Sequence, residues 1–151
     1  MKKKNNNIKG QSMFEVVIAL FIISMIIVGV VSLSTNSLAN SIYSRNKSLS
    51  GRYSQEAIEW IRSEREKNYS NFVTYATTPT YCLDTLAWTN IGTCSSSEVI
   101  PNTIFTREAS FTTYAVSGKN LVEVDVTTSW TDSRGYHEAK SVTNFGDIRE
   151  K

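Results

Sequence analysis

The chain has 151 residues, with 16 basic residues against 14 acidic ones and a formal net charge of +2. This length predicts one modest domain rather than two, and the near-neutral charge gives no indication of nucleic-acid binding. With only two prolines and seven glycines, the composition excludes a collagen-like or disordered chain.

Residues 1–10 form a basic leader. This leader contains four lysines and no acidic residue, and it ends in Lys9-Gly10. Lysines that precede an apolar segment obey the positive-inside rule, so we expect the leader to stay in the cytoplasm. The rest of the chain is then expected to lie across the membrane.

An apolar run follows the leader. Residues 16–33 are eighteen consecutive residues without a charge. As a helix with a rise of about 1.5 Å per residue they would span about 27 Å, close to the hydrocarbon thickness of a bilayer. A buried core helix needs only about 10–14 such residues. Glu15 stands directly before the run, where a charge is costly in lipid, so we expect this carboxylate to have a partner.

A conventional cleaved signal peptide is an alternative interpretation. The sequence Ser37-Leu38-Ala39 fits a small-x-small cleavage site, and the mature chain would then begin at Asn40. Two features count against it: the apolar run is longer than the usual run of about 7–15 residues, and an acid stands where the flank should be purely basic.

The combination of Lys9-Gly10, a glutamate five positions after the glycine and the apolar run behind it resembles the prepilin leader and methylation motif. This motif is shared by type IV pilins and by the pseudopilins of type II secretion. The resemblance implies cleavage after Gly10 by prepilin peptidase and N-methylation of the new N-terminus at Gln11. It also implies that the Glu15 carboxylate pairs with the N-terminal ammonium of a neighbouring subunit during assembly. Gln11 stands where most of the family has an apolar residue, a departure that bears on methylation more than on cleavage.

The resemblance also implies partners and a location. The partners would be other pilin or pseudopilin subunits, prepilin peptidase, an assembly platform protein and its ATPase. The subunit would cross the cytoplasmic membrane once, with its head outside the cytoplasm, before it enters an extracytoplasmic filament. The atypical Gln11 and the absence of a helix-breaking proline late in the apolar run favour a minor subunit. Pilus biogenesis, adhesion, DNA uptake and type II secretion all remain open, because these systems share this anchor.

Residues 34–67 predict an amphipathic continuation of the same helix, because they contain no proline and a single glycine. The whole helix would have roughly 55 residues and end before Asn68. We assign residues 11–35 to the membrane or filament core and residues 36–151 to the head. The apolar side chains of the continuation recur at steps of four or seven along one stripe: Leu38, Ile42, Leu49, Tyr53, Ala57 and Ile61.

Residues 68–100 are rich in threonine, serine and asparagine and lack sustained periodicity, so we expect an irregular loop. Cys82 and Cys94 lie in it, and outside the cytoplasm such a pair predicts a disulfide. A metal site is the competing interpretation, but two cysteines and the distant His137 do not make a ligand set.

Residues 101–151 predict a β-meander. From Leu121 to Trp130 apolar and polar residues alternate with a period of two, and turns are expected at residues 117–120 and 132–135. We expect three antiparallel strands with one face on the helix and the other exposed to water. The predicted fold class is therefore α+β, with a long N-terminal helix packed on a C-terminal antiparallel sheet, as in pilins. The late strand with alternating valines that ends in Trp130 also resembles the I-type minor pseudopilins and the PilV-like minor pilins.

The search for an enzyme gives no candidate. The sequence contains no nucleophile elbow, P-loop, dinucleotide fingerprint or metal-ligand spacing, so we expect no catalytic residue, no cofactor and no bound metal. The single histidine, His137, is expected to be structural or superficial. Four scattered acids do not form an ordered calcium loop: Asp84, Glu98, Asp132 and Asp147.

Three aromatic residues of the head allow two interpretations. Tyr75, Tyr81 and Trp88 could form an exposed recognition surface, but packing in the core is favoured.

The sequence therefore predicts a structural filament subunit rather than an enzyme. One rival is a secreted or membrane-tethered binding domain that uses residues 1–39 as an ordinary signal or anchor. The other is a tethered hydrolase with an unfamiliar active site. The binding-domain hypothesis predicts that Glu15→Ala changes nothing, whereas the filament hypothesis predicts a loss of assembly.

Overall fold

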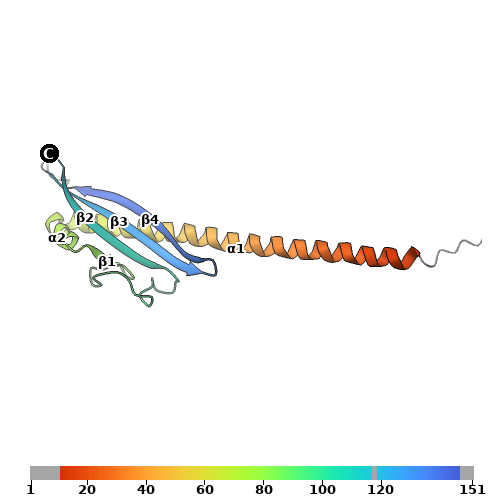
Figure 1. The fold of residues 1–151 in the computed structure, drawn as a ribbon. Helices are drawn as coiled ribbons and strands as arrows, with labels where there is room; N and C mark the ends of the chain where they lie inside the picture. The colour runs from red at the N-terminus through yellow and green to blue at the C-terminus, as the bar shows by residue number, and fades with distance from the viewer. Residues whose placement is uncertain (1–10, 117–118, 147–151) are drawn as a thin grey trace, which may run out of the picture. The chain divides into compact units, whose positions relative to one another are not determined.

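The computed structural model describes residues 11–116 and 119–146. The chain forms two compact units, Met1–Ser44 and Arg45–Lys151, and helix α1 contributes its first part to one unit and its second part to the other. The fold is α+β, with a long N-terminal helix packed on an antiparallel sheet (Figure 1). The elements are α1 (Gln11–Lys67), α2 (Tyr69–Ala76), β1 (Thr80–Cys82), β2 (Thr106–Val116), β3 (Lys119–Asp132) and β4 (Gly135–Gly146).

The sheet is an antiparallel meander with the strand order β1-β2-β3-β4. The central strand, β3, pairs with β4 from Leu121 opposite Gly146 to Asp132 opposite Gly135. Gly135 has a φ of 115°, a left-handed conformation that glycine adopts without steric cost. The predicted turn at residues 132–135 is therefore confirmed.

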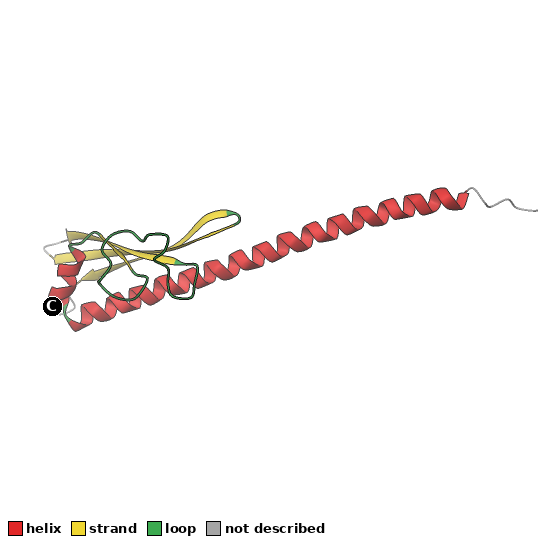
Figure 2. Cartoon of the chain, turned by 90° about the horizontal axis from the view of Figure 1, so that it is seen from below, coloured by secondary structure: helices red, strands yellow, loops and turns green. Residues whose placement is uncertain are grey.

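The second part of α1 packs against the inner face of the sheet, which lies along one side of this stretch (Figure 2). Ala57 and Ile61 are fully buried in the same core cluster as the valines of β3. The predicted alternation of β3 is confirmed, because Val122, Val124, Val126, Thr128 and Trp130 are all buried. Burying one large aliphatic side chain stabilises a fold by about 1.5–3 kcal/mol, so this contact is a main source of the stability of the head.

Two serines let α1 approach the sheet closely. Ser50 and Ser54 are fully buried on the side of α1 that faces β3 and β4. The Ser54 hydroxyl lies 2.8 Å from Thr128 Oγ1, to which it donates, and 3.4 Å from the carbonyl oxygen of Ala139. The Ser50 hydroxyl donates to the Lys47 carbonyl at 2.9 Å. These bonds compensate the loss of water around the buried hydroxyls.

The predicted apolar stripe of α1 is only partly correct. Ala57 and Ile61 lie in the core, and Leu49 and Tyr53 pack against a second cluster formed by buried residues Ile100, Phe105 and Trp130. Leu38 and Ile42, however, belong to the other unit and are exposed. Sequence spacing places a residue on a helix face, but it does not tell how far along the helix the sheet extends.

The segment predicted as irregular contains two elements. The expectation of a loop over residues 68–100 and of three strands is corrected by α2 and by the fourth strand, β1. Asn68 lies between α1 and α2, and its side-chain oxygen accepts the Asn71 N–H at 3.1 Å as the N-cap of α2. Phe72 and Ala76 of α2 are buried. β1 has only three residues and owes its extended form to its pairing with β2.

The predicted Cys82–Cys94 disulfide is present. It links β1 to the segment between β1 and β2, where the Cys94 N–H also donates to the Glu108 side chain at 2.8 Å. The Cys82 N–H donates to the Asn90 carbonyl at 2.9 Å. The crosslink therefore fixes an irregular segment to the edge of the sheet.

We expect Ser54→Ala to lower the free energy of unfolding by about 1–3 kcal/mol, because it removes the donor that bonds the buried Thr128 hydroxyl. The double variant Ser54→Ala/Thr128→Val should recover part of this loss, since both polar partners are then gone. The measurement is denaturant unfolding of the detergent-solubilised full chain, followed by tryptophan fluorescence. A double variant less stable than the sum of the two single variants would contradict this account.

We expect reduction of the disulfide to lower the free energy of unfolding of the head by about 3 kcal/mol, the value for closing a loop of this length. The measurement is the unfolding midpoint with and without a thiol reductant. Cys82→Ser/Cys94→Ser is the control: it should unfold like the reduced chain and respond no further to reductant.

Candidate functional site

The first part of α1 is an apolar surface without a cover in its own unit. Every residue from Met13 to Leu33 is exposed, including Met13 at 77% and Phe14 at 70%. Among the described residues this is the one helix long and apolar enough to cross a membrane, and none of its most apolar stretch is buried. Such a surface is of the kind that lipid or other apolar helices cover.

Two hydroxyl groups in the first part of α1 donate to carbonyl oxygens of the same helix. Ser24 donates to the Phe21 carbonyl at 2.7 Å and Thr35 donates to the Ser32 carbonyl at 2.9 Å. Such internal bonds lower the cost of placing a hydroxyl in an environment without water.

Glu15 is the exception in this segment. It is the sole charged residue in residues 11–44, and its side chain is exposed near the start of α1. No hydrogen bond or ion pair joins its carboxylate to another residue within the described part of the chain. No side chain of residues 11–44 carries a positive charge that could compensate this carboxylate.

The predicted cleavage site falls at the margin of the described residues. Gln11 is the first residue of α1, whereas Gly10 and the side chain of Gln11 lie outside the described residues. Cleavage after Gly10 and methylation of Gln11 stay predictions.

A buried arginine in the head was missed at the sequence level. Arg107 of β2 is 2% exposed and faces α1. It donates from Nε to the Leu83 carbonyl at 3.0 Å and from one terminal nitrogen to the Tyr53 carbonyl at 3.1 Å and to Glu56 at 2.9 Å. Burial lowers the pKa of the guanidinium, while the Glu56 carboxylate opposes that shift. Its place between Phe105 and Ala109 in an alternating strand was the available signal.

Two titratable side chains of the head, His137 and Asp132, lie in contact. His137 Nε2 lies 3.0 Å from the Asp132 carboxylate at the β3–β4 turn. The Arg134 N–H, which donates to this carboxylate, lowers the pKa of Asp132, and the bond with His137 lowers it further.

The acids considered for calcium are not brought together. Asp84 accepts a bond from the Asn90 side chain at 3.0 Å, and Glu98 accepts the Ser95 N–H at 2.6 Å. Asp147 lies outside the described residues. Within residues 11–116 and 119–146, no group of three histidine, cysteine or acidic residues could hold a metal ion.

The three aromatic residues considered for recognition pack mainly on the core. Tyr81 is buried and Trp88 packs against the same cluster. Tyr75 stacks on Trp88 with ring centroids 4.9 Å apart and planes within 7°, and it remains 39% exposed. The core interpretation is thus confirmed for Tyr81 and Trp88, and Tyr75 covers them.

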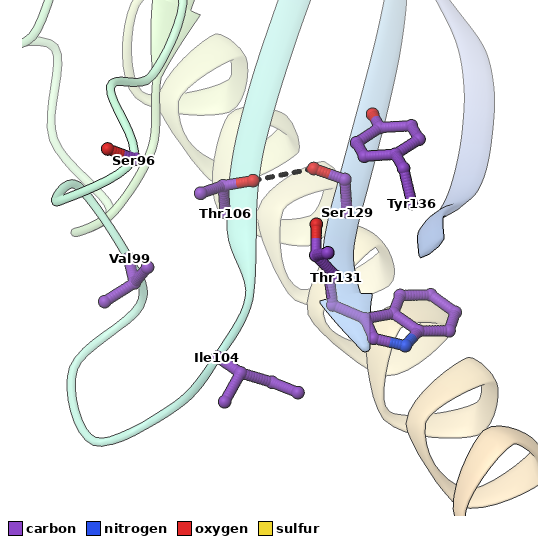
Figure 3. Close-up of a pocket in the computed structure, with 8 residues that line it drawn as sticks. Ser96, Val99, Ile104, Thr106, Ser129, Thr131 and Tyr136 are labelled. Carbon is purple, nitrogen blue, oxygen red and sulfur yellow. Dashed lines mark hydrogen bonds between the residues drawn. The ribbon is translucent and has the colours of Figure 1, made fainter. Parts of the chain in front are cut away.

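The outer face of the sheet carries a shallow cleft of about 300 Å³. Figure 3 shows Val99 and Ile104 on one side of it and Tyr136 on the other, with Thr106 and Ser129 joined by a hydrogen bond between them. That bond is 2.6 Å long. The lining side chains are uncharged and many of them carry hydroxyl groups, so the cleft suits an uncharged group. The complete set of lining residues is Ser96, Val99, Ile104, Thr106, Ser129, Trp130, Thr131 and Tyr136.

The strongest candidate for a functional residue is therefore Glu15, because its carboxylate lies on an exposed apolar helix and needs a cation to compensate its charge. Comparisons of the chain with protein-family models, with curated proteins and with solved structures found no match.

Proposed function

We propose that this chain is a structural subunit of a type IV filament, a minor pilin or a pseudopilin, which prepilin peptidase trims after Gly10. The observation that carries the proposal is the position of Glu15: a lone carboxylate at the start of a helix segment that is exposed and apolar on all sides. The Lys9-Gly10 leader before it supplies the second part of the argument.

The energetics favour assembly over simple anchoring. A carboxylate costs several kcal/mol in a low-dielectric medium unless a cation pairs with it. Cleavage after Gly10 would create a new ammonium group at Gln11, four residues before Glu15 and on the same helix. The ammonium of one subunit can then neutralise the carboxylate of its neighbour when the apolar helices pack lengthwise. Such a pair also fixes the axial register between subunits.

The proposed location follows from the leader and the disulfide. By the positive-inside rule, the leader lysines favour an N-terminus in the cytoplasm and a head on the opposite side of the membrane. The Cys82–Cys94 disulfide suits an oxidising compartment there. The subunit would wait in the cytoplasmic membrane as a single-pass protein, and the platform protein and ATPase would draw it into the filament.

The head is proposed to act by binding rather than by catalysis. Its outer face offers a neutral cleft, and three of its acidic residues, Asp84, Glu98 and Asp132, accept local hydrogen bonds. Neighbouring subunits or a secreted or adhesive partner would be bound on this face, in pilus biogenesis, DNA uptake or type II secretion.

We expect the mature protein from its native host to begin at Gln11. Gly10→Leu should leave the leader attached, because a side chain at this position blocks the extended backbone that a protease cleft requires. Asn7→Leu, a substitution in the same leader away from the scissile bond, is the matched control and should be processed normally. Mass spectrometry of the N-terminal peptide is the measurement. A chain that begins at Met1 or at Asn40 would contradict the proposal.

We expect Glu15→Gln to lower the fraction of subunit found in filaments by at least about tenfold, since one partner of a desolvated ion pair is lost. The variant should still be inserted in the membrane and retain a folded head. Ser24→Ala, which removes a polar but uncharged group from the same apolar segment, is the control and should assemble normally. Normal assembly of Glu15→Gln would instead favour the tethered binding domain.

A further inference from the structure

Strand β4 is an unusually long open edge. It has 12 residues and stands at the end of the strand order, so no described strand pairs with its other side. Its pairing with β3 runs without interruption, and the strand contains no proline or bulge that would protect it.

The hydrogen-bond pattern of the sheet identifies which backbone groups of β4 point outward. The Phe111 N–H bonds to the Pro79 carbonyl and the Leu83 N–H bonds to the Arg107 carbonyl, so odd-numbered residues of β2 face β1. Because paired and unpaired positions alternate in antiparallel sheets, the registers direct the odd-numbered residues of β4 toward β3. The N–H and carbonyl groups of its even-numbered residues then point away from the sheet.

A side-chain contact supports this assignment independently. Lys47 Nζ of α1 donates to the carbonyl oxygen of Glu138 at 2.6 Å, as expected for an even-numbered residue whose carbonyl points away from β3. Lys47 caps one carbonyl of the edge, and the described residues form no such contact with the outward backbone groups of Lys140, Val142 and Asn144.

The side chains of the even-numbered residues of β4 form a self-complementary pattern. Along the outer face of β4 the order is Tyr136, Glu138, Lys140 and Val142, that is, aromatic, acidic, basic and β-branched. All four side chains are exposed, with Tyr136 at 64% and Val142 at 56%. When an identical strand runs antiparallel alongside, Glu138 can lie opposite Lys140 and Tyr136 can lie opposite Val142.

We propose that the β4 edges of two copies of this chain pair antiparallel, with Ala139 opposite Ala139 of the second copy at a two-fold axis. In this register Glu138 lies opposite Lys140 of the second copy, and Tyr136 lies opposite Val142 of the second copy. Both are favourable cross-strand pairs, and each occurs twice because the contact is isologous. Glu138 and Lys140 are both outward-facing, so they form hydrogen-bonded pairs, and the two sheets become one.

The contact would be weak and reversible for a single pair of heads. An edge-to-edge contact buries little surface compared with a stable dimer, and Lys47 has to share the Glu138 carbonyl, which has two lone pairs, with the incoming strand. Repetition of the same edge along an assembly would convert a weak contact into a strong one by avidity.

The symmetry also determines where the contact occurs. Within the head, β4 and the stretch of α1 beneath it run in the same general direction (Figure 1). A two-fold axis perpendicular to β4 reverses both in the second copy. The contact therefore joins heads of opposite polarity. If the chain is a filament subunit, as proposed above, two heads of opposite polarity belong to different filaments or to opposed surfaces. Only this step rests on the proposed function.

A charge-swap series on the detergent-solubilised full chain tests the pairing. Glu138→Lys and Lys140→Glu each place like charges opposite one another twice, so each should weaken self-association on the order of tenfold. The double variant Glu138→Lys/Lys140→Glu restores the pattern and should restore association. Glu123→Lys, which changes a charge on the outer face of β3 away from the edge, is the matched control and should associate normally. Sedimentation over a range of protein concentrations measures the association.

Thiol cross-linking reads the register in the same preparation. Ala139→Cys should form an intermolecular disulfide on mild oxidation, because directly opposite Cα atoms at a non-hydrogen-bonded pair lie about 4.5 Å apart. Val142→Cys faces Tyr136 of the second copy and should not cross-link to itself. A chain that stays monomeric, a double swap that fails to recover, or cross-linking through Val142→Cys instead would overturn the proposal. None of these outcomes depends on the mature N-terminus, so the two proposals fail separately.

Discussion

The packing of α1 against β3 is the contact on which the head depends. The sheet has only one well-covered face, and Ala57 and Ile61 of α1 complete it together with the β3 valines. The buried hydroxyls of Ser54 and Thr128 hold the helix at a short distance that larger side chains would not allow. Arg107 adds a polar link, since one guanidinium joins α1 and the segment that follows β1. Without α1 the apolar inner face of the sheet would be exposed to water, and the sheet would not be stable by itself.

The same helix has to satisfy two different environments. Residues 11–44 carry a single charge and are exposed throughout most of their length, whereas the part from Arg45 onward buries one stripe and exposes charged residues on the other. Salt bridges such as Arg62–Glu59 and Lys67–Glu64 lie on the exposed side, where they contribute little to stability. The uneven distribution of charged residues along α1 is therefore better explained by the different surroundings of its two parts than by local salt bridges. Glu15 is the residue that this division does not explain, which is why it carries the functional proposal.

Long periodic segments were predicted well from the sequence, and short ones were not. The extent of α1 and the inward alternation of β3 followed from simple spacing, because each repeats over many residues. α2 is short and stands in a polar segment, so its Asn68 cap was read only as the end of α1. β1 could not be predicted, since three residues become a strand only through contacts with Glu108, Ala109 and Ser110. Arg107 was missed because an arginine in a strand is normally read as exposed.

The candidate functional features also differ in how far the sequence predicts them. Glu15 and the Cys82–Cys94 pair could be found from local sequence, because a charge beside an apolar run and a cysteine pair are visible without a fold. The outer-face cleft and the open edge of β4 could not, since both depend on which strands are neighbours and on the parity of their hydrogen bonds. These features are properties of the sheet rather than of any one segment.

The stretch from Ser95 to Val99 has its two ends fixed by different means. Before it, Cys94 is held by the disulfide and by Glu108; after it, Ile100 is buried against Phe105 and Trp130. The residues between contribute no member to either core cluster, yet Ser96 and Val99 form a wall of the cleft. Lengthening such a clamped loop costs little, about 0.6 kcal/mol for each doubling. This stretch is therefore where the head can acquire new ligand preferences by mutation or insertion while its scaffold stays unchanged.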